Sequence, residues 1–444
     1  MTFNPLSLFA YSRRMRSGPT ERVRERFERY GDLYCAPFLG RDVFVLRHPD
    51  HLQEVLVTQA SKFEKPSEGI TARQLRLLLG QGLLNSNGEL WRRQRRLIQP
   101  AFRRERLEEY AELILEHTEH MLDGWLDGAS LDASREMMEL TLRIVSKALF
   151  NHRVTDETDR VATAMRVLRQ SFGGFQALLP AWLPLPSRGR TLKALADMDA
   201  IIYELIDAPR DGQGRDLLST LAAAFGAQGG ERAEQRRQLR DELVTLFIAG
   251  HETTSHALSW TWHLLSTHPE VEQKLHAELA RVLGGRPPRW SDLEHLPYAE
   301  QVLSESMRLY PPAYVLARVA SADAVVGGHT IPRGSDVVMW SYLTHHDARW
   351  FPDPERFDPE RFSPARRKAI PQCAYIPFGA GTRTCIGKQF ALMEALLILT
   401  RTAQRFTLSA VPGARIERDM SVTLAPRHGL TLRVCSRGDR TPAA

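Results

Sequence analysis

The sequence has few cysteines, few lysines and no long apolar run. Its four cysteines, Cys35, Cys373, Cys385 and Cys435, contain no C-x-x-C pair, which argues against a disulfide scaffold and a structural zinc site. No run of about 18 apolar residues occurs, so we expect no transmembrane anchor. In Met1 to Arg16 the basic residues follow a short apolar stretch, the reverse of the order in a signal peptide. We therefore expect a cytoplasmic protein with reduced thiols.

The charge pattern excludes other classes. Arginine outnumbers lysine by 52 to 7, yet the net charge of the 444 residues is only +6, which does not indicate nucleic-acid binding. Hydrophobic residues make up 43% and charged residues 25%, as in globular proteins. Disordered, collagen-like and disulfide-rich classes are thus excluded, and the chain is long enough to bury a core and enclose a cofactor.

Hydrophobic periodicity predicts a mainly helical protein with a small β-rich portion. We find no internal repeat and no long linker, and interpret residues 1–444 as one unit without a fused reductase. The predicted helices are Arg104 to Leu126, Met137 to Phe150, Leu192 to Ile206, Leu239 to Thr267, Glu270 to Leu283, Ala299 to Leu309 and Phe390 to Phe406. The predicted strands cluster in Leu33 to Leu46, Val325 to Trp340 and Phe406 to Val434.

Two connections stand out by composition. Val337 to Pro377 is proline-rich with little periodicity, and a structureless connection of that length is usually functional or held by specific contacts. Ser171 to Gly189 is aromatic and proline-rich. It either covers an apolar cavity, contacts a membrane or partner, or is an ordinary packed connection between helices.

The most informative stretch surrounds Cys385. Gly379, Gly381 and Gly387 permit unusual backbone angles and close approach to a flat object. Cys385 precedes a helical run, and Arg383 adds positive charge, so we expect a lowered thiol pKa. A phosphate-binding P-loop is excluded, because no Gly-Lys-Ser/Thr ends the stretch. The pattern favours a thiolate metal ligand.

This stretch resembles the haem-binding signature of the cytochrome P450 family, F-x-x-G-x-R-x-C-x-G. The matching residues are Phe378, Gly381, Arg383, Cys385 and Gly387. The resemblance implies that Cys385 is the axial thiolate on haem iron, with Gly379 also beside the cofactor, and that the protein has the mainly α family fold. Companion motifs follow the family's order from Trp91 to Cys385.

A second motif lies within the predicted helix Leu239 to Thr267. Ala249 and Gly250 are small enough to let a flat ligand approach the helix, and the hydroxyls of Thr253 and Thr254 can bond back to the helix and open a bulge. The motif resembles the family's A-G-x-D/E-T sequence. That likeness implies that Glu252 and Thr253 guide protons to the oxygen being activated.

A zinc protease is the competing interpretation, since His251-Glu252 begins H-E-x-x-H. The next histidine is His256, five residues after His251. Five helical residues rotate by about 500°, which leaves the second imidazole roughly 140° off the first face. The two ligands would diverge, so we reject the zinc site.

A third motif is Glu305-Ser-Met-Arg308 on a helix that ends before Pro311. Glu305 and Arg308 share a helix face and can pair. The family adds an arginine from a proline-rich loop, and the pattern F-x-P-x-R-F selects Arg361 over Arg356. The resemblance assigns this network to structural support of the cysteine loop.

Haem carboxylates need positive partners. Trp91 and Arg95 have the spacing W-x-x-x-R, which places ring and guanidinium on one helix face. By resemblance they bind a haem propionate, with Arg318 and Arg383 as further partners.

The resemblance implies a haem b monooxygenase that inserts one atom of O2 into an apolar substrate, by hydroxylation or epoxidation. Electrons would come from a separate ferredoxin or flavodoxin and its NAD(P)H-dependent reductase. The alternatives are a P450-type peroxygenase, an isomerase of oxygenated lipids, or a haem-binding protein without turnover. Glu252-Thr253 argues against all three, because those relatives do not need a proton-delivery pair.

Two further expectations concern ligands. The predicted specificity segments are mostly apolar, which indicates a fatty acid, terpenoid, steroid or polyketide. They are the segment after Lys65 through Leu84, Leu168 to Leu183, the helix residues before Ala249, Tyr314 to Ala317, and the surroundings of Thr423-Leu424. A basic surface is expected to attract an acidic redox partner. It comprises Arg92, Arg93, Arg96, Arg103, Arg104 and Lys388.

Overall fold

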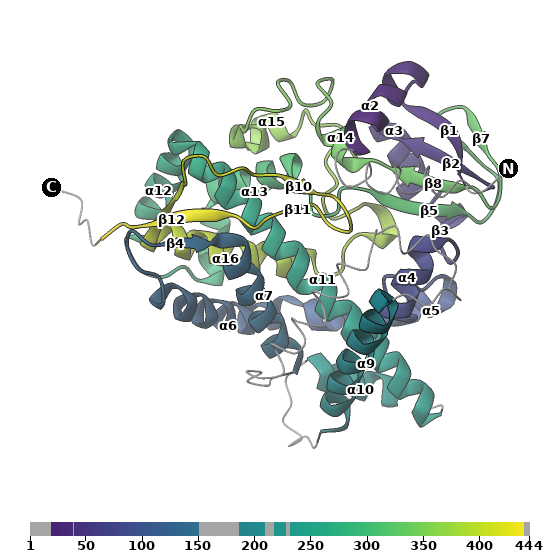
Figure 1. Cartoon of the computed structure of the whole chain (residues 1–444), viewed down its shortest axis with the longest axis horizontal. Coiled ribbons are helices and arrows are strands. Elements are labelled where there is room, and N and C mark those ends of the chain that lie inside the picture. The colour runs from purple at the N-terminus through teal and green to yellow at the C-terminus, as the bar shows by residue number, and fades with distance from the viewer. Residues whose placement is uncertain (1–18, 39, 151–185, 209–216, 228–230, 439–444) are drawn as a thin grey trace.

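The computed structural model describes residues 19–38, 40–150, 186–208, 217–227 and 231–438. Helices dominate this part of the chain, with a five-stranded sheet at one side and smaller β pieces, including β4 and β12, toward the other (Figure 1). The helices are α2 (Pro19–Tyr30), α3 (Pro49–Gln53), α4 (Ile70–Leu79), α5 (Gly88–Ile98), α6 (Arg104–Asp123), α7 (Ala133–Phe150), α9 (Pro186–Asp207), α10 (Leu217–Gly226), α11 (Arg232–Thr267), α12 (Pro269–Leu283), α13 (Pro297–Leu309), α14 (Ser341–His345), α15 (Pro364–Arg367) and α16 (Lys388–Arg405).

The main sheet has five strands in the order β1-β2-β8-β5-β3, and only the β2–β8 pair is parallel. A second sheet has the order β4-β12-β9, and β6–β7 and β10–β11 are separate pairs. The strands are β1 (Leu33–Phe38), β2 (Arg41–Leu46), β3 (Phe63–Glu64), β4 (Ser130–Asp132), β5 (Leu316–Ala320), β6 (Ala324–Val326), β7 (His329–Ile331), β8 (Asp336–Met339), β9 (Phe406–Ala410), β10 (Arg418–Asp419), β11 (Ala425–Pro426) and β12 (Thr431–Ser436).

Helix α11 crosses the molecule from the region of α12 and α13 to that of α9 and α10 (Figure 1). It is buried on most of its faces, because one apolar cluster packs it against α6, α7, α12, α13 and α16, and another packs it against α4, α9 and α10. The segment that carries Ala249 to Thr254 is therefore fixed from several sides.

The helix and strand predictions hold for the described residues, with ends that differ by a few residues. One expectation is wrong. Val337 to Pro377 is not structureless, since it begins inside β8 and contains α14, α15 and the short 3₁₀ turn η6 (Pro359–Phe362). Prolines at the first positions of η6 and α15 are compatible with helix starts, which hid these turns from the periodicity. Residues 171–185 of the predicted connection Ser171 to Gly189 lie outside the residues that the structure describes.

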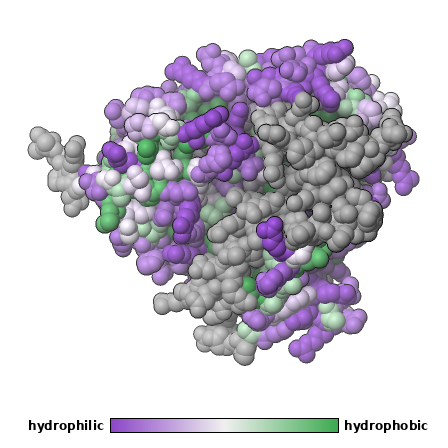
Figure 2. Space-filling view, in the orientation of Figure 1, coloured by the Kyte–Doolittle hydropathy of each residue, from purple (hydrophilic) through white to green (hydrophobic). Residues whose placement is uncertain are grey.

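The surface of the described residues is mostly hydrophilic in the orientation of Figure 1 (Figure 2). Among these residues, no helix is both long enough and apolar enough to cross a bilayer.

Candidate functional site

The loop before Cys385 is a tight turn that requires glycine. Gly379 and Gly381 have φ angles of 70° and 68°, in the left-handed region. A Cβ on Gly381 would lie 1.9 Å from the carbonyl oxygen of Leu56, so no other residue fits. The turn is closed by the Cys385 N–H, which donates to the Phe378 carbonyl at 2.9 Å. The sequence thus presents Cys385 at a fixed position just before α16.

Cys385 is accessible on one side, yet its thiol pKa is raised and not lowered as the sequence predicted. Burial is the largest influence and raises the pKa. It outweighs the Gly387 backbone and the charges of Arg95 and Lys388, which favour the thiolate. The start of α16 thus affects the pKa of the Cys385 thiol less than desolvation does. A bound metal cation would itself deprotonate the thiol.

Trp91 and Arg95 of α5 lie beside the cysteine loop. The Arg95 Nη1 donates to the Thr384 carbonyl at 3.0 Å. The guanidinium carbons of Arg95 and Arg383 lie 5.8 Å and 4.3 Å from the centroid of the Trp91 ring. The indole therefore supports two cations at the edge of the loop.

Arg318 is a buried cation and Arg383 a half-buried one, and both have spare hydrogen-bonding capacity. The Nη2 of Arg383 donates to the Ser86 carbonyl and to Asn87 Oδ1, both at 2.8 Å, whereas its buried Nη1 has no partner among the described residues. The Nη1 of Arg318 donates to its neighbour's carbonyl, that of Ala317, at 2.8 Å. Burial lowers the pKa of each guanidinium to about 10, and for Arg383 the charge of Arg318 adds to this effect.

Lys65 joins this cluster, although the sequence analysis assigned it no role. Its backbone N–H and carbonyl each bond to the Asn87 side chain at 2.9 Å, and Asn87 also binds Arg383. Burial, followed by the charges of Arg318 and Arg383, holds the Lys65 pKa well below its usual range. Nothing in the sequence marked Lys65, which directly precedes a predicted specificity segment.

None of the four cations Lys65, Arg95, Arg318 and Arg383 has an ion pair within the described part of the chain. Gathering buried like charges is unfavourable unless an anion balances them. The unpartnered Nη1 of Arg383 also lacks an acceptor. This donor set fits a ligand with carboxylates at one edge, and the accessible Cys385 fits a metal in that ligand.

Of the pair Ala249-Gly250, only Ala249 has the surroundings expected of a ligand-facing residue. Ala249 is exposed although most of α11 is buried, as a ligand-facing position requires. A Cβ at Gly250 would instead lie 3.0 Å from Val145 of α7, so the packing of α7 on α11 explains this glycine.

The hydroxyls of Thr253 and Thr254 bond back to the carbonyls of Ala249 and Gly250, at 2.8 Å and 3.4 Å. The predicted bulge is absent, and α11 runs as a continuous α-helix through this turn. On both sides of this turn α11 packs against several other helices, and this packing keeps the helix continuous.

Glu252 is buried beside a hydroxyl and an imidazole. Its Oε1 accepts from Thr423 Oγ1 at 3.0 Å and lies 3.6 Å from His256 Nε2. His251 faces another way, with Nδ1 2.7 Å from the Phe247 carbonyl. Within the described residues, no group of three or more histidine, cysteine, aspartate or glutamate side chains is placed to hold a metal ion.

A second carboxyl, Glu394 of α16, lies near Thr254 and is fully buried. Burial raises its pKa to about 8, against a smaller opposite effect of Thr254, so Glu394 is largely protonated at neutral pH. Two acids close to the same turn of α11 therefore hold different charges, since the Glu252 pKa is lowered.

The structure brings Glu305, Arg308 and Arg361 together. Arg308 binds both oxygens of Glu305, with Nε–Oε2 2.7 Å and Nη2–Oε1 2.8 Å, and Arg361 Nε reaches Oε1 at 3.2 Å. Arg308 also donates to the carbonyls of His345, Pro354 and Arg356. The side chain of Arg356 is exposed, so its backbone alone takes part. The long connection is thus tied to α13 by buried charge-assisted bonds.

The expected basic surface is exposed. Arg92, Arg93 and Arg96 of α5 and Arg103 and Arg104 after it all face solvent. The Cβ position of Gly387 lies 3.6 Å from Phe102, so this segment and the cysteine loop border each other. Arg92 pairs with Glu89 and Arg104 with Glu108, which leaves Arg93, Arg96 and Arg103 without an ion pair in the described residues.

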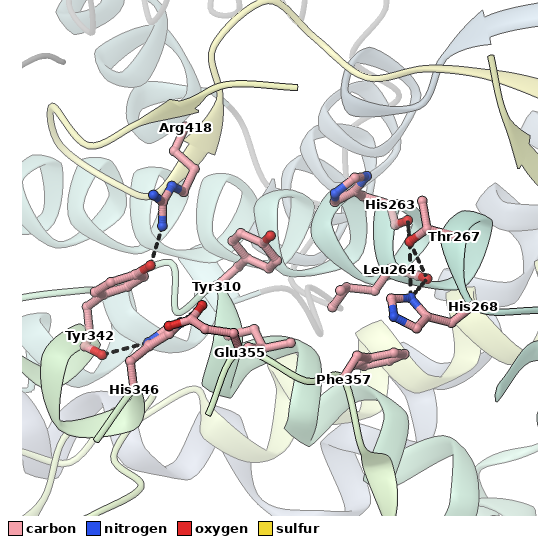
Figure 3. A pocket seen from close by; sticks show the side chains of 11 residues that line it. His263, Leu264, Thr267, His268, Tyr310, Tyr342, His346, Glu355, Phe357 and Arg418 are labelled. Carbon is pink, nitrogen blue, oxygen red and sulfur yellow. Dashed lines mark hydrogen bonds and ion pairs between the residues drawn. The ribbon is translucent and has the colours of Figure 1, made fainter. Parts of the chain in front are cut away.

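Two cavities lie elsewhere. One of about 210 Å³ is at the C-terminal end of α11, where His263 and His268 face Tyr342, His346 and Arg418 (Figure 3). The other, of about 390 Å³, lies between α6, α7 and β12. Neither is lined by Cys385 or Thr253, so we assign neither to the chemistry of the cysteine loop.

A family model and several known proteins match this chain along most of its length. The family model described as Cytochrome P450 matches residues 2–432. The chain is 38% identical over 413 residues to cyclooctatin synthase of Streptomyces melanosporofaciens, covering 89% of this chain and 88% of that protein. It is 36% identical to cyclooctat-9-en-7-ol 5-monooxygenase of the same organism, covering 87% and 84%. It is 34% identical to pentalenene oxygenase of Streptomyces avermitilis, covering 92% and 91%.

Proposed function

This chain belongs to the cytochrome P450 family, and from that premise we propose that Cys385 is the axial ligand of its haem iron. The protein is a haem-thiolate monooxygenase that uses O2, an organic substrate and electrons from redox partners. The observation that carries the site assignment is the cluster of buried and half-buried cations without an ion pair in the described residues, beside an accessible cysteine. We further propose haem b, since the sequence has no C-x-x-C-H motif for covalent attachment.

When bound, the haem supplies oxygen activation and insertion of one oxygen atom. Cys385 would hold the iron as a thiolate and would supply electron density to it. Arg95, Arg318, Arg383 and Lys65 would bind the propionates, whose charges would neutralise the cation cluster. Ala249 leaves room on α11 for the flat ring.

The pair Glu252–Thr253 on α11 would deliver protons to the oxygen being activated. The Thr253 hydroxyl, bonded to the Ala249 carbonyl, is held at a fixed orientation, and the adjacent Glu252 supplies the carboxylate that exchanges protons. The Glu305–Arg308–Arg361 network acts at a distance by fixing the connection that precedes the cysteine loop.

We propose a terpenoid-type substrate, supported by the printed names of two relatives, a pentalenene oxygenase and a cyclooctat-9-en-7-ol 5-monooxygenase. Apolar residues of α4 such as Leu75, Leu78 and Leu79 agree with an apolar ligand. We propose an acidic ferredoxin or flavodoxin as the separate electron donor, supported by the exposed arginines beside the cysteine loop. The cytoplasmic location and the organisation as one unit without a fused reductase stay predictions.

The test combines binding and turnover of the haem-loaded protein. A library of cyclic terpenoid alkenes and alcohols, with fatty acids and steroids beside them, is screened for substrate-induced shifts of the haem spectrum. Each binder is then incubated with a ferredoxin system, NADH and O2. The proposal expects terpenoid products that require both reductant and O2. Turnover with peroxide alone, or spectral shifts confined to fatty acids or steroids, would contradict it.

A further inference from the structure

Glu252 and Thr253 are neighbours in sequence, but their side chains have different surroundings. Thr253 Oγ1 donates to the Ala249 carbonyl on its own helix at 2.8 Å. Glu252 Oε1 instead accepts from Thr423 Oγ1 at 3.0 Å, and Thr423 lies in the loop between β10 and β11. Consecutive helical residues point about 100° apart, so the two side chains reach different neighbours, and the neighbours of Glu252 decide how its carboxylate is held.

His256 completes the surroundings of Glu252 from the next turn of α11. Its Nε2 lies 3.6 Å from Glu252 Oε1, and the two side chains are only 4% and 9% exposed. Both ring nitrogens of His256 are buried and have no hydrogen-bond partner in the described part of the chain. A buried carboxylate needs a paired charge or donors to remain ionised. His256 and Thr423 supply these two needs.

The charge balance at Glu252 depends on His256. Burial would raise the pKa of Glu252, but the neighbouring His256, with smaller effects of His251 and Thr423, lowers it to about 2. His251 and His256 are the titratable groups near Glu252 on α11, although His251 Nδ1 is directed to the Phe247 carbonyl, and Thr423 contacts Glu252 from the β10–β11 loop. Burial lowers the pKa of His251. His256 is therefore the neighbour that contributes most to keeping Glu252 ionised.

We propose that His256 and Thr423 are positioning residues that hold Glu252 ionised and oriented for proton delivery through Thr253. This inference rests on the proposed role of the Glu252–Thr253 pair in the monooxygenase reaction. His256 sets the ionisation of Glu252, and Thr423 sets its direction. Neither residue needs to contact the haem or the reacting oxygen.

The experiment uses the haem-loaded protein with its ferredoxin system and a substrate that the wild type oxidises. The variants are His256→Phe, which removes both ring nitrogens, His256→Gln, which keeps only an amide donor, and Thr423→Val, which removes the hydroxyl at similar volume. His263→Gln is the matched control, because His263 lies on α11 about two turns further along and lines the separate cavity of Figure 3.

Three measurements distinguish a positioning role of His256 and Thr423 from a merely structural role. Product formed per NADH should fall by about tenfold in His256→Phe, less in His256→Gln and Thr423→Val, and not in His263→Gln. In His256→Phe, coupling should rise with pH between ~6 and ~8, since burial then leaves Glu252 protonated at the lower pH. Infrared difference spectra of His256→Phe against the wild type should show an additional protonated-carboxyl band, beside that of Glu394, and this additional band should be absent from the Glu252→Gln/His256→Phe double variant.

The outcomes also distinguish this inference from the proposed function. If His256→Phe and His256→Gln retain wild-type coupling, pH profile and infrared spectrum, His256 is not a positioning residue. Full coupling in Thr423→Val overturns the role of Thr423. If Glu252→Gln alone couples as the wild type does, the proton-delivery pair itself is wrong. Should His256→Phe fail to bind haem, His256→Gln and Thr423→Val still decide the question.

Discussion

Replacing Arg308 by leucine should cost this protein a large share of its stability. Arg308 is fully buried and makes two charged bonds to Glu305 and bonds to three backbone carbonyls. Burial raises the pKa of Glu305, and Arg308 is the main group that opposes this effect. Without Arg308, Glu305 keeps only the 3.2 Å contact of Arg361 and the N–H of Asp358.

The expected cost is about 3–5 kcal/mol, because one partner of a buried charge pair is left uncompensated. That is a large part of a typical folding free energy of about 5–15 kcal/mol. Arg361→Leu keeps the two-bond Glu305–Arg308 pair and removes one charged contact and one bond to the Asp353 carbonyl. It should cost less, about 1.5–3 kcal/mol. The exposed Arg356 is the control, and Arg356→Leu should change stability by at most about 0.5 kcal/mol.

The assay measures the urea midpoint of unfolding and the haem content of each purified variant. We expect the largest loss of stability in Arg308→Leu, a smaller loss in Arg361→Leu and none in Arg356→Leu, with haem lost in the same order. Arg308→Leu protein with the midpoint and haem content of Arg356→Leu would refute the reasoning.

Three further predictions test other parts of the site. Thr253→Ala should bind haem and substrate normally but form peroxide in place of product, measured as product and peroxide per NADH, and unchanged coupling would place the proton path elsewhere. Arg96→Glu with Lys388→Glu should raise the apparent KM for an acidic ferredoxin, and wild-type electron transfer should slow with salt as the Debye length shrinks from about 10 Å at 0.1 M to about 3 Å at 1 M. Rates indifferent to both changes would exclude electrostatic docking at this face. Burial raises the pKa of Glu394 from 4.5 to about 8, so its contribution to stability is full below pH 4.5 and is lost as the pH rises through 8. Glu394→Gln should flatten the fall of the urea midpoint between these pH values, and an unchanged slope would show that Glu394 is not buried as a neutral acid.

Local spacing carried most of what the sequence could predict. Helical periodicity fixed the main helices, and the i, i+3 spacing of Glu305 and Arg308 placed both on one face. The glycine requirement at Gly381 is equally local, since it follows from a turn. The choice of Arg361 came from the family pattern, and the structure places its guanidinium against Glu305.

Contacts between distant segments were not predictable in this way. Thr423 lies 171 residues from Glu252, and Lys65 matters because folding buries it beside Arg318 and Arg383. His256 was considered only as a zinc ligand, because its distance from Glu252 depends on side-chain geometry. The pKa of Cys385 was predicted in the wrong direction, since the sequence reveals charges and helix ends but not the degree of desolvation.

The most direct test of the central claim is the absorption spectrum of the reduced carbon monoxide complex of the haem-loaded protein. The account predicts that the wild type shows the Soret shift specific to a thiolate ligand and that Cys385→Ser loses it, because a hydroxyl cannot donate electron density as a thiolate does. Cys435→Ser, which replaces a cysteine in β12, should keep the shift. Retention of the shift in Cys385→Ser would contradict the assignment of Cys385 as the iron ligand.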